Sequence, residues 1–240
     1  MAGILYIISA PSGSGKSTLV NELRSLVPNL EFSISYTTRA PRGSEQNGRE
    51  YYFVSRREFE EMIRREEFLE HAEVFGNYYG TAKRFLREAE ARGNDLLLDI
   101  DVQGAAQVKE RAHDSVSIFV LPPSRRDLER RLRNRSQSEA ASTKGGGMTD
   151  DVIERRLLEA AKEIEKYSKY DYILVNEDLQ EAVECLKTIV LSERKLRSGK
   201  ALDDSEQAMI VTARKCLQAA QAKSGKLQEI LDSFAPAKSG

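Results

Sequence analysis

The chain has 240 residues, of which 31% are charged, and its formal net charge at pH 7 is −1. This length suits one domain of moderate size, alone or with an appendage, and the balanced charge offers no general basic field for nucleic acid or an anionic membrane. No apolar run is long enough for a membrane span, which needs about 20 residues, and the first apolar segment begins too early to leave room for a signal peptide. Cys185 and Cys216 are far apart in the sequence and form no metal or redox motif, so we expect reduced thiols in a cytoplasmic protein.

The N-terminal region combines three patterns in the order strand, loop, helix. The apolar, β-branched run from Ile4 to Ser9 predicts a buried strand, and apolar residues recur with helical spacing from Leu19 to Val27. Between them lies Ala10-Pro-Ser-Gly-Ser-Gly-Lys-Ser17. Backbone N–H groups of such a loop surround a phosphate chain at the helix N-terminus. The order predicts a P-loop that binds a nucleoside triphosphate; the alternative is a chance Gly/Ser loop before a helix.

Two side chains of this loop carry chemistry. Lys16 supplies a cation for the terminal phosphates, and the Ser17 hydroxyl is a ligand for the Mg²⁺ that accompanies ATP. The motif usually begins with glycine, and Ala10 is a mild departure because Gly13 and Gly15 make the tight turn. The candidate ATP-binding residues are Ala10, Pro11, Ser12, Gly13, Ser14, Gly15, Lys16, Ser17 and Thr18.

The rest of the chain alternates apolar runs with helical patterns, which predicts an α/β fold: a parallel-sheet core with helices on both faces. Further strands are expected at 96–100, 116–121 and 172–175. Helices are expected near 56–66, 82–92, 103–112, 124–134, 150–168 and 178–197. Ser55 with Glu58, and Ser124 with Asp127, have the spacing of helix N-caps.

Between residues 30 and 81 the composition changes to short polar and aromatic segments, which predict a small β-rich insert. In a P-loop enzyme such an insert usually serves the second substrate. Arg39 and Arg42 lie close together in it, and Tyr51 and Tyr79 follow. Two guanidinium groups and two phenol hydroxyls that converge on one spot would bind a phosphate dianion well. The alternative is that the arginines are solvated loop charges and the tyrosines pack within strands.

Five short segments are informative together: Ala-Pro-Ser-Gly-Ser-Gly-Lys-Ser, Ser-Tyr-Thr-Thr-Arg-Ala-Pro-Arg, Asn-Gly-Arg-Glu-Tyr-Tyr-Phe-Val, Gly-Asn-Tyr-Tyr-Gly-Thr and Leu-Leu-Asp-Ile-Asp-Val-Gln-Gly. They resemble the guanylate kinase family of nucleoside monophosphate kinases, in order, from about residue 3 to about residue 197. The resemblance implies a kinase-like domain over 1–200 and an extension over 201–240. Within the domain it implies a core at about 1–32, 82–134 and 157–200, a GMP-binding lobe at about 33–81 and a helical lid at about 135–156.

The resemblance also implies the activity: phosphorylation of GMP, and of dGMP, by direct in-line transfer from ATP with Mg²⁺, in nucleotide biosynthesis and GMP recycling. ATP and GMP are the implied partners, and a monomer and a homo-oligomer both stay open. The implied GMP-binding residues are Arg39, Arg42, Tyr51 and Tyr79 for the phosphate, Ser35, Glu70, Thr81 and Asp101 for the guanine, Glu45 as support for the arginine loop, and Asp99. The implied catalytic residues are Lys16, Arg135, Arg156 and Asp99, with Asp99 a second candidate metal contact beside Ser17.

Physical chemistry agrees with the guanine assignment. Guanine presents N1–H and its N2 amino group as adjacent donors, and a carboxylate such as Glu70 accepts both, whereas adenine has no proton on N1. The alternative for Glu70 is a surface carboxylate beside His71. Asp99 and Asp101 alternate at the end of an apolar strand, which in open α/β sheets is where ligands bind.

Arginines gather in the implied lid, where the transferred phosphoryl group needs cations over its three oxygens. By the resemblance Arg135 and Arg156 fill that role, with Arg131 as a third candidate. The segment 136–150 is longer than the family's usual lid turn, and Gly145–Gly147 would keep it flexible. We interpret the remaining arginines of this region, Arg130, Arg133 and Arg155, as surface charges.

The sequence leaves two alternative functions to consider. Guanylate-kinase-like domains also serve in scaffold proteins as non-catalytic phosphopeptide-binding modules, but those have a degraded P-loop, and Lys16 and Ser17 are present here. A kinase for another nucleoside monophosphate is distinguished by Ser35 and Glu70.

Residues 201–240 lie beyond the resemblance and show apolar residues at near-helical spacing, interrupted at Ser224-Gly225. We expect two short helices or one kinked helix, which dock on the domain or on a second subunit without a catalytic role. The alternative is a largely disordered tail beyond about residue 222.

Overall fold

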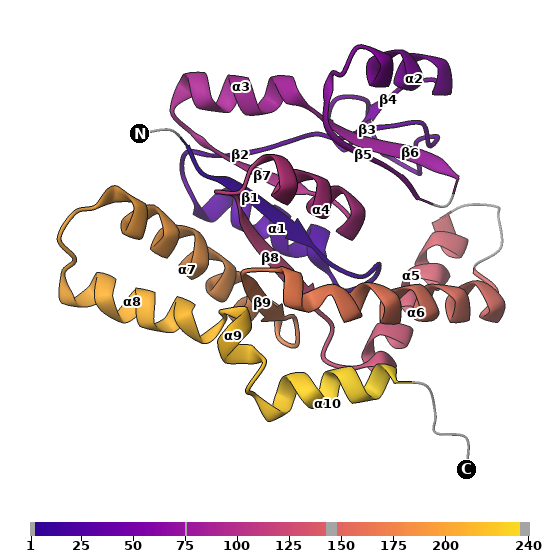
Figure 1. Cartoon of the computed structure of the whole chain (residues 1–240). Coiled ribbons are helices and arrows are strands. Elements are labelled where there is room, and N and C mark those ends of the chain that lie inside the picture. The colour runs from indigo at the N-terminus through magenta and orange to yellow at the C-terminus, as the bar shows by residue number, and fades with distance from the viewer. Residues whose placement is uncertain (1–2, 75, 143–147, 236–240) are drawn as a thin grey trace. The chain divides into compact units, whose positions relative to one another are not determined.

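The computed structural model describes residues 3–74, 76–142 and 148–235, without the side chains of 138–142 (Figure 1). The chain divides into two compact units. The first unit comprises Met1–Ser9 and Val27–Ser117, and the second comprises Ala10–Leu26 and Ile118–Gly240. Within the described residues, no helix is both long and apolar enough to cross a membrane.

The first unit contains parallel strands in the order β2-β7-β1. These are β1 (Leu5–Ser9), β2 (Leu30–Phe32) and β7 (Asp95–Asp99). Every residue of β1 is buried, as is expected of a parallel strand that is covered on both faces. Helices α3 (Lys83–Arg92) and α4 (Val102–Arg111) pack against this sheet. The predicted strands near the N-terminus and at 96–100 are thus confirmed to within one residue.

A second sheet in the same unit is the β-rich insert, with strand order β4-β3-β6-β5. Its strands are β3 (Tyr36–Thr37), β4 (Tyr52–Phe53), β5 (Phe68–Val74) and β6 (Asn77–Ala82). Helix α2 (Arg56–Arg64) begins with the predicted capping box of Ser55 and Glu58. The ring of Phe59 stacks on Phe68 at 4.4 Å between centroids, so aromatic packing joins α2 to β5.

The second unit contains the parallel pair of β8 (Val116–Leu121) and β9 (Tyr172–Val175), joined in register from Ile118↔Tyr172 onward. Its helices are α1 (Lys16–Leu26), α5 (Arg125–Ser142), α6 (Asp150–Ile164), a 3₁₀ helix (Glu165–Lys169) and α7 (Leu179–Ser198). Helix α1 packs on α7, and α5 packs on α6. The predicted cap of α5 is confirmed, because the Asp127 N–H donates to the Ser124 hydroxyl at 3.0 Å.

Three helices follow α7: α8 (Asp204–Lys215), α9 (Gln218–Gln221) and α10 (Gly225–Phe234). Helix α8 lies alongside α7 (Figure 1), and α10 packs on α5, where the Ser233 hydroxyl accepts a hydrogen bond from the Arg125 N–H at 3.0 Å. The buried side chains of α10 are Leu227, Ile230 and Phe234. The expected docking on the domain is therefore found. The alternative of disorder beyond residue 222 is wrong for 223–235, because these apolar residues are buried; residues 236–240 lie outside the described residues.

Some boundaries differ from the prediction. Helix α5 continues to Ser142 rather than ending near 134, because Gln137, Glu139 and the two alanines that follow are good helix formers. Strands β2 and β5 have no clear sequence signal, since β2 has three residues and β5 carries Glu and His between its apolar positions. The glycines at 145–147 lie outside the described residues.

Candidate active site

The loop before α1 has the backbone geometry of a phosphate cradle. Gly13 and Gly15 adopt φ values of +96° and +90°, which side chains of L-residues disfavour. The Ser14 N–H donates to the Pro11 carbonyl at 3.1 Å and closes the turn. A Cβ atom on Gly15 would lie 2.4 Å from the Asn176 amide nitrogen, so this position excludes any larger residue.

Two side chains from elsewhere in the second unit hold this loop. The Asn176 side-chain amide and one Arg131 guanidinium nitrogen both donate to the Ser14 carbonyl, at 2.7 and 3.0 Å. A second Arg131 nitrogen donates to the Asn176 carbonyl at 2.8 Å, and burial lowers the pKa of Arg131. The Ser14 carbonyl is thereby occupied by protein donors. Arg131 thus lies against the P-loop.

Asn176 was missed by the sequence analysis. It directly follows the predicted strand at 172–175, and the carboxyl end of a parallel strand is where ligand-binding side chains gather, so that position was the available signal. Lys16 opens α1 and is half-buried, while Ser17 and Thr18 are exposed on its first turn. The Ser14 hydroxyl is buried and has no hydrogen-bond partner within the described residues.

The first unit brings Arg39, Glu45, Tyr51 and Tyr79 together. The guanidinium of Arg39 binds both carboxylate oxygens of Glu45, at 3.0 and 2.9 Å, and Glu45 also accepts from the Arg42 N–H at 2.7 Å. Burial acts to lower the pKa of Arg39, but hydrogen bonds with Glu45 and contact with Tyr79 outweigh it and raise that pKa. The Arg42 side chain is exposed, so Glu45 holds this residue by its backbone.

Tyr51 links this cluster to the end of β7. Its ring lies 5.3 Å from the Arg39 guanidinium carbon and makes an edge contact with Tyr79 at 6.0 Å between centroids. Burial raises the pKa of Tyr51 to about 12, and the negative charge of Asp99 adds to this shift. The phenol therefore stays protonated at neutral pH, as a hydrogen-bond donor to an anion must. One region of the first unit is thus surrounded by four residues, Arg39, Tyr51, Tyr79 and Asp99.

A second cluster of polar side chains is buried beside the first turn of α4. Glu70 on β5 is only 3% exposed and is paired in register with Thr81 on β6. A Cβ atom on Gly104 would lie 2.3 Å from a Glu70 carboxylate oxygen, so a larger residue there would displace the Glu70 carboxylate. Asp101 accepts hydrogen bonds at 2.8 Å from the N–H groups of Gln103 and Gly104 and caps α4.

This second cluster has unused hydrogen-bonding capacity. The Thr81 hydroxyl is fully buried and has no hydrogen-bond partner in the described part of the chain. Ser35 is also buried, at 9% exposure. Gly104 was not singled out from the sequence, although a glycine inside a predicted helix is a signal of close approach. The sequence-predicted guanine-binding residues, Ser35, Glu70, Thr81 and Asp101, are all buried or half-buried in the first unit.

The predicted lid arginines lie on two helices that pack together. Arg135 is on α5 and Arg156 is on α6. Two ion pairs fasten these helices to each other: Arg133 binds Asp150 and Arg125 binds Glu154, each at 2.6 Å.

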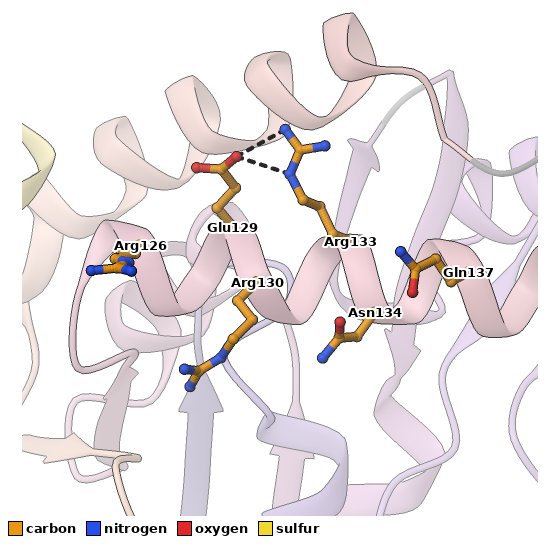
Figure 2. A pocket seen from close by; sticks show the side chains of 6 residues that line it. All are labelled: Arg126, Glu129, Arg130, Arg133, Asn134 and Gln137. Atoms are coloured by element: carbon orange, nitrogen blue, oxygen red, sulfur yellow. Dashed lines mark hydrogen bonds and ion pairs between the residues drawn. The ribbon is translucent and has the colours of Figure 1, made fainter.

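One face of α5 has a hollow of about 440 Å³, which Figure 2 shows with its lining residues. They are Arg126, Glu129, Arg130, Arg133, Asn134 and Gln137. Arg133 pairs with Glu129 at 2.9 Å, and Arg130 pairs with Asp127. Arg130 and Arg133 are well exposed, which agrees with their interpretation as surface charges.

No group of three or more His, Cys, Asp or Glu side chains that could hold a metal ion occurs among residues 3–74, 76–142 and 148–235. A P-loop together with a cluster of arginine and tyrosine side chains is the combination expected of a P-loop nucleotide kinase. The guanylate kinase family model matches residues 3–193. The chain belongs to the guanylate kinase family.

Individual relatives support this membership. The chain is 58% identical to a guanylate kinase of Koribacter versatilis over 98% of its own length and 97% of that protein's. It is 47% identical to a guanylate kinase of Escherichia coli, over 80% of this chain and 89% of the other. A crystal structure of guanylate kinase from Anaplasma phagocytophilum matches with a TM-score of 0.63 and 37% identity, over 80% of this chain and 86% of that one.

Proposed function

We propose that the chain transfers the γ-phosphoryl group of ATP to GMP, and to dGMP, and releases ADP and the guanosine diphosphate. The observation that carries the base specificity is the buried carboxylate of Glu70, a residue that lies opposite Thr81 in the strand register and whose carboxylate lies close to Gly104. A carboxylate accepts hydrogen bonds at both of its oxygens, and guanine N1–H and the N2 amino group present two adjacent donors to it. AMP lacks both donors, and a site of this kind discriminates by about 10⁴-fold.

The acceptor phosphate is assigned to Arg39, Arg42, Tyr51 and Tyr79. Arg39 is held in position by Glu45, and Tyr51 keeps its proton because burial raises its pKa to about 12. Preorganised donors of this kind bind a phosphate dianion without reorganising on binding. GMP and dGMP differ only at the 2′ position of the sugar, so both satisfy these contacts.

The donor nucleotide is assigned to the P-loop, with Lys16 at the terminal phosphates. Ser17 fits Mg²⁺ chemically, because its exposed hydroxyl is a hard oxygen donor at a helix N-terminus, and Asp99 is the second candidate contact. When bound, Mg²⁺ would neutralise charge on the β- and γ-phosphates. Arg135 and Arg156 are assigned to the equatorial oxygens of the transferred group, where negative charge spreads in the transition state. No side-chain nucleophile takes part in direct in-line transfer.

The test is a coupled assay of ADP release with GMP, dGMP, AMP, UMP and dTMP as acceptors. We expect turnover with GMP and dGMP and none above background with the other three. Equal turnover with AMP would refute the assignment of Glu70. Absence of ADP release with every acceptor, while phosphopeptides still bind, would favour the non-catalytic scaffold module instead.

A further inference from the structure

The two cysteines, 31 positions apart in the sequence, are neighbours in the structure. Cys185 lies on α7 and Cys216 caps the C-terminus of α8. Interaction with Cys216 raises the pKa of Cys185, so the two side chains lie close together, and both residues are half-buried. Both are free thiols, as expected, and although no sequence motif joins them, the α7–α8 hairpin brings them together.

The register between helices α7 and α8 gives a second, independent reason for the proximity of the two cysteines. Helices α7 and α8 pack closely and run antiparallel (Figure 1), and Lys195 forms an ion pair with Glu206 near the turn between them. Cys185 precedes Lys195 by ten residues, and Cys216 follows Glu206 by ten. Both helices rise about 1.5 Å per residue, so the register that joins Lys195 to Glu206 places the cysteines at the same height.

The backbone around Cys216 is fixed. Its carbonyl accepts a hydrogen bond from the Ile173 N–H at 2.7 Å, and its N–H donates to the Ala213 carbonyl at 2.9 Å. Leu217 then forms an isolated bridge with Tyr172 on β9. The backbone of Cys216 is therefore held to β9 and to the last turn of α8 by contacts that do not involve sulfur.

The pKa values of the two thiols are shifted in opposite directions. The hydrogen bond from Cys185 lowers the pKa of Cys216, and the nearby Lys215 adds to this effect. The same hydrogen bond, together with burial, raises the pKa of Cys185. Since the thiolate is the nucleophile in disulfide exchange, Cys216 is the attacking group and Cys185 the resolving group.

We propose that Cys185 and Cys216 are a redox modification site that forms a reversible intramolecular disulfide and fastens the C-terminal helices α8–α10 to α7. The oxidant is a small-molecule disulfide. The Cys216 thiolate attacks one of its sulfurs and releases one small thiolate, which leaves a mixed disulfide on Cys216. Cys185 then loses its proton, attacks the Cys216 sulfur and releases the second small thiol. Two protein thiols are oxidised as one small disulfide is reduced to two thiols. The proposal does not depend on the proposed function.

The test uses the full-length protein, reduced and then exposed under native conditions to glutathione disulfide. We expect the intact mass to fall by two hydrogen atoms with loss of both alkylatable thiols, and reductant to reverse the change. Cleavage after Lys200, in the connection between α7 and α8, should release the C-terminal segment from reduced protein under denaturing conditions but leave it attached to oxidised protein. Tm should rise by about 5 °C or more, since the cross-link closes a loop.

Single variants separate the two roles. Cys185→Ser should stop at a stable glutathione adduct on Cys216, and Cys216→Ser should react several-fold more slowly. The wild-type protein decides the main question even if a variant fails to fold. Thiols that stay unreactive, glutathione adducts that persist on the wild type, or disulfide-linked dimers would each overturn the proposal.

Discussion

The P-loop and the buried polar cluster around Glu70 are built in opposite ways. The loop presents consecutive backbone N–H groups, and its shape depends on the positive φ values of Gly13 and Gly15. The cluster consists of the side chains of Glu70 on β5 and Thr81 on β6, with Gly104 of α4 close to the Glu70 carboxylate. A backbone-built site tolerates side-chain changes that preserve its shape, whereas a side-chain-built site loses its selectivity when a single polar atom changes. Four predictions test this contrast.

The largest effect on kcat is expected at Lys16, because at this position the P-loop depends on a side chain rather than on its backbone. Lys16→Ala should lower kcat by at least about 10²-fold, because a preorganised charge at the transferred phosphoryl group is lost. GMP affinity, measured by calorimetry without ATP, should persist, since Arg39 and Tyr51 belong to the other unit. Turnover close to that of the wild type would contradict the P-loop assignment.

Glu70→Gln should have the next largest effect, and this effect should concern GMP rather than ATP. The amide keeps the size but places a donor against guanine N1–H or N2, so KM for GMP should rise by roughly 10- to 100-fold. KM for ATP should barely change. Glu73→Gln is the matched control, because Glu73 is on the same strand but exposed. Equal effects of Glu70→Gln on GMP and ATP would mean that Glu70 has a structural role.

Asn176→Ala tests whether the loop needs its external support. Removing the 2.7 Å hydrogen bond to the Ser14 carbonyl should raise KM for ATP by roughly 5- to 10-fold, the equivalent of one hydrogen bond. The affinity for GMP is the internal control and should not change. An unaltered KM for ATP would show that Arg131 alone holds the loop.

The same contrast explains what could be predicted from the sequence. The P-loop and the strands at 96–100, 116–121 and 172–175 depend on neighbouring residues, so local patterns revealed them. The contacts of Gly104 with Glu70, of Asn176 with Ser14 and of Cys185 with Cys216 join distant positions. No local pattern encodes such pairs, because strand register and helix packing decide them. Among the residues assigned to guanine, Ser35, Glu70 and Thr81 were accessible only through family resemblance, whereas the place of Asp101 at a strand end also indicated a ligand site.

The smallest effect on catalysis is expected at the C-terminus, which lies outside the matched span of 3–193. Truncation after Gly199 removes the buried side chains of α8 and α10, among them Ile210, Leu227 and Phe234. Full burial of each contributes about 1.5–3 kcal/mol, so Tm should fall by at least about 5 °C. The residues assigned to ATP and GMP all precede the cut, so kcat below the lowered Tm should stay within about threefold of the wild type, as for a change of less than 1 kcal/mol. Kinetics at low temperature and sedimentation of the truncated protein check both statements. A collapse of kcat in a truncated protein that is still folded would show that α10, through its contact with α5, supports catalysis.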